Sequence, residues 1–219
     1  MHFKTIHSMP LALVILVITL GTGNAAGSSP AGHPTPSSPA NEPYTPPTVQ
    51  DRLDWFAATS FGPLNLVGGG FISAVTTAAN QPPEWGGTWE GFSKRFGTFL
   101  GGTTMSHAME AGLGTIWGED PRYLTSGKHG FWSRTSYALK TSVLAYNRSG
   151  RLMPAYARYI GTVGNNFIVS TWLPPSNNGW QDALESSGYQ FLGRFASNMF
   201  IEFWPEVAEK LHLKRPAGK

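Results

Sequence analysis

The longest regular pattern of positions in the chain runs from Trp89 to Trp117 and is helical. Small residues recur in it at steps of three and four, so they would share one face of a helix. They are Gly97, Gly101, Thr104, Ala108, Ala111 and Thr115. Because small residues let a second helix approach closely, we expect this stripe to pack against a helix drawn from residues 55–80. Asp120-Pro121 should end the helix, since the residue before a proline avoids the α-helical region.

Further helices are predicted downstream, and one segment stays ambiguous. Residues 152–173 and 179–204 have helical patterns, and Pro205 suits the first turn of a last helix that reaches Leu213. Residues 133–148 fit two patterns. Tyr137, Leu139, Thr141, Val143 and Ala145 alternate as on a strand, whereas Arg134, Ala138, Thr141, Ala145 and Arg148 would line one face of a helix.

These patterns favour an all-α fold, a single domain of about five to six helices with a packing seam lined by glycine and alanine. The alternative is a membrane β-barrel, which the 26 glycines and the 13% of aromatic residues would also fit. Against the barrel, alternating segments of about ten residues separated by turns are mostly missing.

The first residues have the three parts of a secretory signal. Lys4 is basic, residues 11–20 (LALVILVITL) are apolar, and Gly23 and Ala25 are the small residues before a cleavage site. A helix of that length spans about 15 Å, about half of a bilayer core, so an anchor is not expected. We therefore predict a signal peptide over 1–25 and an exported protein of the periplasm or cell envelope.

The rest of the chain divides by composition. Residues 26–50 are rich in proline and serine and are expected to form a disordered tether. Residues 51–213 form the predicted helical domain, and 214–219 form a basic tail. The chain contains no cysteine, which excludes disulfides, a thiol nucleophile and a cysteine-based zinc site.

Charge is scarce and unevenly placed. Charged residues make up 13% of the chain, about half of the usual 25%. Residues 55–83 and 159–181 carry no charge, and 96–109 carry none apart from His107. No stretch of 18 apolar residues follows the leader, so an ordinary membrane-spanning helix is not expected. These segments are either helices of a packed core or segments that enter a bilayer interface.

Residues 121–181 form a basic-aromatic segment with seven cations and no acid. The cations are Arg122, Lys128, Arg134, Lys140, Arg148, Arg151 and Arg158, and they alternate with Tyr123, Phe131, Trp132, Tyr137, Tyr146, Tyr156 and Tyr159. Such a surface attracts anionic lipid headgroups or cell-wall polymers. Export disfavours nucleic acid as the partner. Alternatively, acids of the flanking helices pair with these cations.

Candidate catalytic residues are few. His107 and Glu110 lie three apart on the predicted helix and would share a face, but no other histidine completes a metal or acid-base set. No phosphate loop, dinucleotide motif or metal site is found, so no cofactor is expected. Glu119 and Asp120 fall at the end of the helix, where acids cost roughly 0.3–1 kcal/mol each. We expect ion pairs to clamp this corner, with Arg122 nearest.

Three phrases carry a resemblance: GTWEGFSKRFG at 87–97, WGEDPRY at 117–123 and MPAYARYIG at 153–161. Together they resemble an uncharacterised family of exported bacterial proteins. The resemblance covers most of residues 84–205 and implies kinship without any activity, fold or ligand.

The favoured interpretation is a non-enzymatic, exported helical protein that associates with the cell envelope, with an anionic membrane or cell-wall surface as its partner and self-association as a second form of binding. The alternative is an envelope hydrolase acting on lipid or polysaccharide, with Glu110 or Asp120 as its acid. An open cleft with either carboxylate beside His107 would favour the hydrolase, and closed packing around both would favour the first interpretation.

Overall fold

The computed structural model describes residues 44–210. The signal peptide, most of the tether and the basic tail predicted above lie outside the described residues. In chain order the elements are α2 (Val49–Phe61), α3 (Pro63–Ala78), the short 3-10 helix η1 (Pro83–Trp85), α4 (Trp89–Trp117), α5 (Phe131–Val143), β1 (Leu144–Tyr146), β2 (Leu152–Pro154), α6 (Tyr156–Tyr159), the π-helical turn η2 (Ile160–Gly164), α7 (Asn165–Ser170) and α8 (Trp180–Lys210). The all-α prediction is confirmed.

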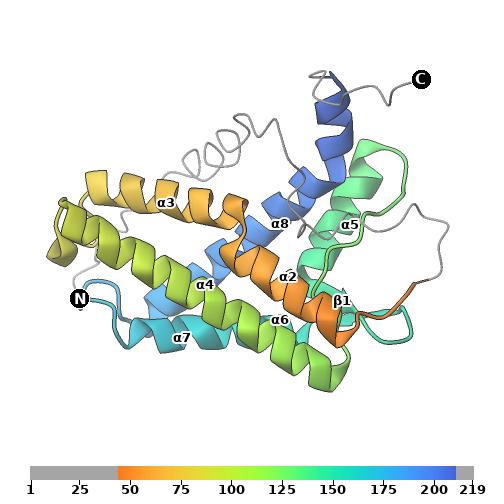
Figure 1. Cartoon of the computed structure of the whole chain (residues 1–219), viewed down its shortest axis with the longest axis horizontal. Coiled ribbons are helices and arrows are strands. Elements are labelled where there is room, and N and C mark those ends of the chain that lie inside the picture. The colour runs from red at the N-terminus through yellow and green to blue at the C-terminus, as the bar shows by residue number, and fades with distance from the viewer. Residues whose placement is uncertain (1–43, 211–219) are drawn as a thin grey trace.

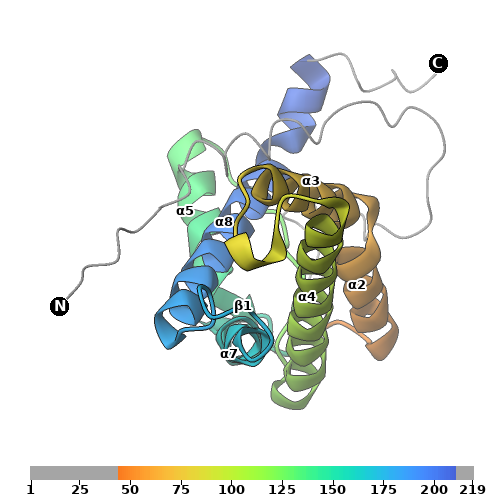
Figure 2. The same cartoon turned by 90° about the vertical axis from the view of Figure 1, so that its left-hand side faces the viewer.

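Helix α4 lies at the centre of the arrangement (Figure 1). Helices α2 and α3 pack along one side of it, and α6, η2 and α7 pack along another. Helix α8 contacts α5, α7 and η2 and passes behind α4 in Figure 1. Figure 2 looks along the bundle and shows α4 between α2 and α7. The strands within 44–210 form one short antiparallel pair, in which Ala145 lies opposite Met153.

The bounds of α4 agree with the predicted Trp89 to Trp117, but its end has another cause. Gly118 adopts a left-handed conformation with φ of 75°, and its N–H bonds to the Gly114 carbonyl. The Glu119 N–H donates to the same carbonyl at 2.8 Å. Glycine accepts this conformation without steric cost, so the helix stops before Asp120-Pro121 can act.

The predicted small stripe is not the buried face of α4, and this is a correction. A side chain at Gly97 or Gly101 would meet no atom within 4 Å. The small residues that do pack are Gly102, Ser106 and Gly114. A Cβ at Gly102 would lie 3.2 Å from Val169 Cγ2, so this seam faces α7 and η2 rather than the 55–80 region. Helices α2 and α3 pack on α4 elsewhere, where Gly69 lies against the Phe99 ring.

Other element predictions need smaller corrections. Residues 133–148, which fitted both a helix and a strand pattern, contain both elements: α5 ends at Val143 and strand β1 follows. Strand β2 takes the start of the helix predicted from residue 152, so helical turns begin only at Tyr156. Helix α2 begins at Val49, inside the stretch assigned to the tether.

Helix α8 is continuous to Lys210 with Pro205 inside it, so no separate last helix begins at Pro205. Proline removes one backbone donor from the helix. Pro205 lies at an exposed position, and the Arg134 guanidinium donates to the Glu202 carbonyl in the preceding turn. The carbonyl that loses its donor is that of Ile201, and the interruption lies at an exposed turn of the helix.

The interior is polar and the outside is rich in large apolar side chains. Among the described residues, the buried apolar side chains are alanines and two prolines apart from Trp55, Tyr137 and Val169. The buried charged residues are Arg52, Arg95, Glu110, Glu119, Asp120, Arg158 and Glu202. The charge-free helix α3 buries only Gly69 and Ser73 and exposes Leu64 and Val67. Its apolar face is therefore not part of a packed core.

Candidate functional site

Glu110 is the centre of a buried charge cluster that joins three elements. Its Oε1 accepts a hydrogen bond from Arg158 Nε of α6 at 2.9 Å, and its Oε2 accepts one from Arg194 Nη2 of α8 at 2.5 Å. Burial alone would raise the pKa of the Glu110 carboxyl, but Arg194 and Arg158 bring it below its usual value. Both oxygens are thus held by permanent cations, and Glu110 stays ionised.

Arg158 connects this cluster to the end of α5. Its Nη1 donates to the backbone carbonyls of Thr141 at 2.7 Å and Leu144 at 3.1 Å. These carbonyls belong to the last turn of α5 and to β1, where a cation complements the helix end. One guanidinium therefore joins α4, α5 and α6.

His107 lies beside this cluster but forms no acid-base pair with Glu110. Its Nδ1 is 3.1 Å from Ser60 Oγ, and its ring packs edge-on to Trp55 with 5.3 Å between centroids. Burial, with a contribution from Arg194, lowers the pKa of His107 to about 4. The ring is neutral at neutral pH. No group of three or more possible metal ligands occurs within 44–210.

The corner after α4 is clamped as predicted for Asp120. Its Oδ1 accepts from Arg122 Nε at 3.0 Å, and its Oδ2 accepts from Arg122 Nη2 at 2.9 Å and from the Tyr44 hydroxyl at 3.2 Å. Asp120 is almost completely buried, so the pair is closed to solvent.

Glu119 is held differently from Asp120. Its Oε2 accepts the Ala157 backbone N–H at 2.9 Å, at the start of α6, while its Oε1 is buried without a hydrogen-bond partner among the described residues. Burial raises the pKa of this carboxyl. The acid thus supports the N-terminus of one helix instead of pairing with a cation.

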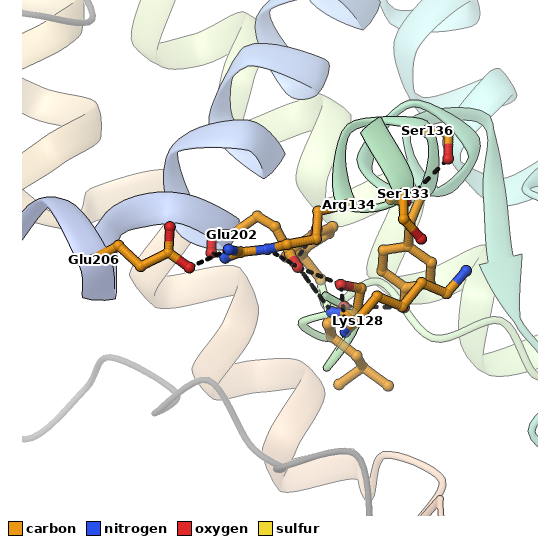
Figure 3. A network of polar contacts seen from close by, with 10 residues as sticks. Lys128, Ser133, Arg134, Ser136, Glu202 and Glu206 are labelled. Atoms are coloured by element: carbon orange, nitrogen blue, oxygen red, sulfur yellow. Dashed lines mark hydrogen bonds and ion pairs between the residues drawn. The ribbon is translucent and has the colours of Figure 1, made fainter. Parts of the chain in front are cut away.

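Glu202 of α8 is the centre of a second network, which Figure 3 shows from close by. It accepts hydrogen bonds from the Tyr123 hydroxyl at 2.6 Å, from the Ser126 N–H at 3.0 Å and from Arg134 Nε at 3.1 Å. Arg134 also pairs with Glu206 one turn later. The network fastens residues 123–134 to α8.

The seven cations proposed as binding residues fall into two groups. Arg122, Arg134 and Arg158 are in the ion pairs just described. The other four, Lys128, Lys140, Arg148 and Arg151, have no acid within ion-pair distance in the described part of the chain, and all four are exposed. Lys128 lies over the Tyr137 ring, 5.4 Å from its centroid, and Arg148 Nη2 donates to the Thr115 carbonyl at 3.0 Å. Internal pairing therefore accounts for three cations and leaves four available.

Three of the seven rings of the basic-aromatic segment are exposed, three are half-buried, and Tyr137 is buried. Trp132 at the start of α5 is 79% exposed, and Phe131 beside it is 55% exposed. A surface groove of about 480 Å³ is lined by Trp117, Met153, Tyr156 and Ile160. Other large apolar side chains are exposed along α2, α3, α7 and α8. The apolar surface is therefore distributed over the molecule, with the groove as one part of it.

Several site residues were missed from the sequence, namely Arg52, Arg194 and Glu202. A signal for the buried face of α4 was present: Arg95, Gly102, Ser106, Glu110 and Gly114 recur at steps of four and seven. This pattern marks one helix face as clearly as the predicted stripe does. It mixes charged and small residues, however, and such a face is typically exposed.

No family model, no curated protein and no solved structure matches this chain. Within residues 44–210, no helix combines the length and apolar character needed to cross a membrane. A function for this chain must therefore be inferred from its sequence and structure.

Proposed function

We propose that this chain is an exported helical protein of the cell envelope that associates with lipid through its exposed apolar side chains. The unpaired cations of the basic-aromatic segment would face anionic headgroups. Kinship with the exported family that the three phrases resemble, and secretion by the predicted leader, are parts of the same proposal.

One observation carries the proposal: the usual distribution of side chains is reversed. Charged groups such as Glu110 and Arg158 are buried, while large apolar side chains are exposed on every long helix. Large exposed apolar patches mark contact with a partner or a membrane. Interior ion pairs satisfy the charges of Glu110, Asp120 and Glu202 away from water, as an apolar environment requires.

The basic-aromatic segment supports lipid over a purely apolar partner. Lys128, Lys140 and Arg151 are exposed cations of the segment that also carries the exposed Trp132. Each cation near an anionic membrane contributes about 1 kcal/mol. Aromatic rings with a polar edge are also typical of the membrane interface. Closed packing around Glu110 and Asp120 favours this proposal over an envelope hydrolase.

The test is flotation of the purified protein with vesicles of neutral phosphatidylcholine and with vesicles that also contain phosphatidylglycerol. Apolar contact predicts binding to both that survives high salt. The cations predict stronger binding to the anionic vesicles at low salt, because salt screens the electrostatic attraction to the headgroups. If the protein forms defined oligomers and floats with neither vesicle, a second copy covers the apolar surface and the proposal is wrong.

A matched pair of variants locates the contact. Trp132→Gln removes the most exposed ring of the basic-aromatic segment, and Ser133→Gln changes its exposed neighbour in the same turn. We expect Trp132→Gln to weaken vesicle binding several-fold and Ser133→Gln to leave it unchanged. Equal binding by both variants would show that α5 does not meet the lipid.

A further inference from the structure

Two arginines of this protein are equally buried but differ in their partners. Arg95 donates to the carbonyls of Gln81 at 2.6 Å, Gly86 at 2.8 Å and Pro82 at 2.8 Å. Arg52, in the first turns of α2, is 6% exposed, yet its side chain makes no hydrogen bond or ion pair with the described residues. A buried guanidinium without partners is costly, so the charge of Arg52 calls for an anion.

Glu119 lies beside Gly114 of α4 but accepts the Ala157 N–H, and no acid among the described residues forms an ion pair with Arg52. Its Nη1 atom is buried against α4, where a Cβ on Gly114 would lie only 3.0 Å from it. Asp120 is the carboxylate whose charge acts on Arg52, and both of its oxygens already accept hydrogen bonds from Arg122 or Tyr44. Burial lowers the pKa of Arg52, and Arg122 and Arg148 add to this effect. This corner therefore carries an excess of positive charge.

A cleft of about 180 Å³ opens beside Arg52. Its lining residues are Pro46, Pro47, Val49, Arg52, Thr115 and Arg148, and none of them is acidic. Arg148 is exposed and uses Nη2 for the Thr115 carbonyl, so the rest of its guanidinium can turn to a ligand. Val49 and Leu53 are exposed on the same helix as Arg52.

We propose that this cleft binds one phosphate group between Arg52 and Arg148. Arginine is suited to phosphate because its planar donors match two oxygens at once. The group can come from inorganic phosphate or from the headgroup of a phospholipid whose chains would extend along Val49 and Leu53. Binding of free phosphate stands independently of the proposed function, whereas binding of the headgroup rests on it.

The first experiment titrates the purified chain with inorganic phosphate at constant ionic strength and follows the heat of binding and the melting temperature. Arg148→Gln should weaken phosphate binding about tenfold, the equivalent of one charge-assisted hydrogen bond. Lys94→Gln is the matched control, because Lys94 is an exposed cation that lies outside the basic-aromatic segment and does not line the cleft. In parallel, the three proteins are floated with phosphatidylcholine vesicles that contain either phosphatidic acid or diacylglycerol.

The outcomes separate the two sources. Binding of inorganic phosphate that depends on Arg148 and not on Lys94 identifies a site for a free oxyanion. Binding only to the vesicles with phosphatidic acid, with the same dependence on Arg148, identifies a headgroup site. If phosphate acts no more strongly than chloride, and Arg148→Gln and Lys94→Gln behave alike in both assays, the proposal is wrong even if the protein binds lipid through its apolar surface.

A second variant tests the charge excess without any ligand. Thr115→Glu places a carboxylate at the lining of the cleft, and Thr115→Gln adds the same bulk without charge. If the cleft lacks an anion, the glutamate variant melts at a higher temperature than the glutamine variant and responds less to phosphate. An acid in the last turn of α4 is otherwise unfavourable, so an equal or lower melting temperature would contradict the proposal.

Discussion

Two of the interfaces of helix α4 differ in kind. Toward α6 and α8 the contact is made by charge, with Glu110 held between Arg158 and Arg194. Toward α3 the contact is van der Waals packing, with Gly69 against the Phe99 ring. Only the second resembles an ordinary helix seam. The first depends on a complete set of partners, so removal of one member should cost far more than a change of volume.

The largest expected effect is at the charged interface. Glu110→Gln leaves two guanidinium groups without their counter-charge, and breaking a buried pair in this way costs about 3–5 kcal/mol. Denaturant unfolding measures this loss. Glu90→Gln on the same helix is the control, because Glu90 pairs with Lys94 at the surface and its loss should change little. A loss below 1 kcal/mol at Glu110 would show that the cluster does not hold the helices together.

His107, which lies beside the charged cluster and packs on α2, predicts a pH dependence. The pKa of His107 is about 4 in the fold and about 6.5 in the unfolded chain, so unfolding takes up a proton in between. Stability should be complete above about pH 6.5 and fall as the pH drops toward 4, by roughly 2 kcal/mol at pH 5. The pKa of Glu110 is also lowered, so its contribution is lost only at more acidic pH.

Unfolding curves at several pH values test this, with His107→Gln for comparison. The variant should lose the decline between pH 6.5 and about 4.5 and keep the more acidic one. If the wild-type curve is flat in the upper range, His107 is already accessible to protons and is not held neutral by burial.

A change at the packing interface between α3 and α4 should lower stability less. A Cβ at Gly69 would lie 2.1 Å from Phe99 Cε1, so Gly69→Ala must displace the ring. Overpacking of this kind costs about 1–3 kcal/mol. Gly70→Ala is the matched control, because its Cβ would meet nothing within 4 Å and alanine is the better helix former. Equal melting temperatures of the two variants would mean that α3 adjusts on α4 without cost.

The sequence predicted the elements better than their faces. The bounds of α4 and the ion pair of Asp120 followed from local patterns, because a helix period and a nearby Arg122 are visible along the chain. The charge cluster did not, since Arg158 and Arg194 lie far from Glu110 in sequence and only tertiary packing joins them. The wrong face of α4 was predicted to be buried, because small and apolar residues were assumed to lie inside. In this chain large apolar residues lie outside, so that assumption fails.

The smallest predicted effect addresses that error at Gly101. If the stripe of small residues packed against another helix, Gly101→Leu would insert bulk into a close contact and cost about 1–3 kcal/mol. In the structure Gly101 is exposed and a Cβ there meets no atom within 4 Å. Leucine is the better helix former by roughly 0.5–1 kcal/mol, so the variant should melt at a slightly higher temperature than the parent. Gly102→Leu, one residue further along, should melt lower, because its Cβ already lies 3.2 Å from Val169 Cγ2. If Gly101→Leu destabilises as much as Gly102→Leu does, the stripe is covered in the native protein, and the assignment of faces on α4 must be reversed.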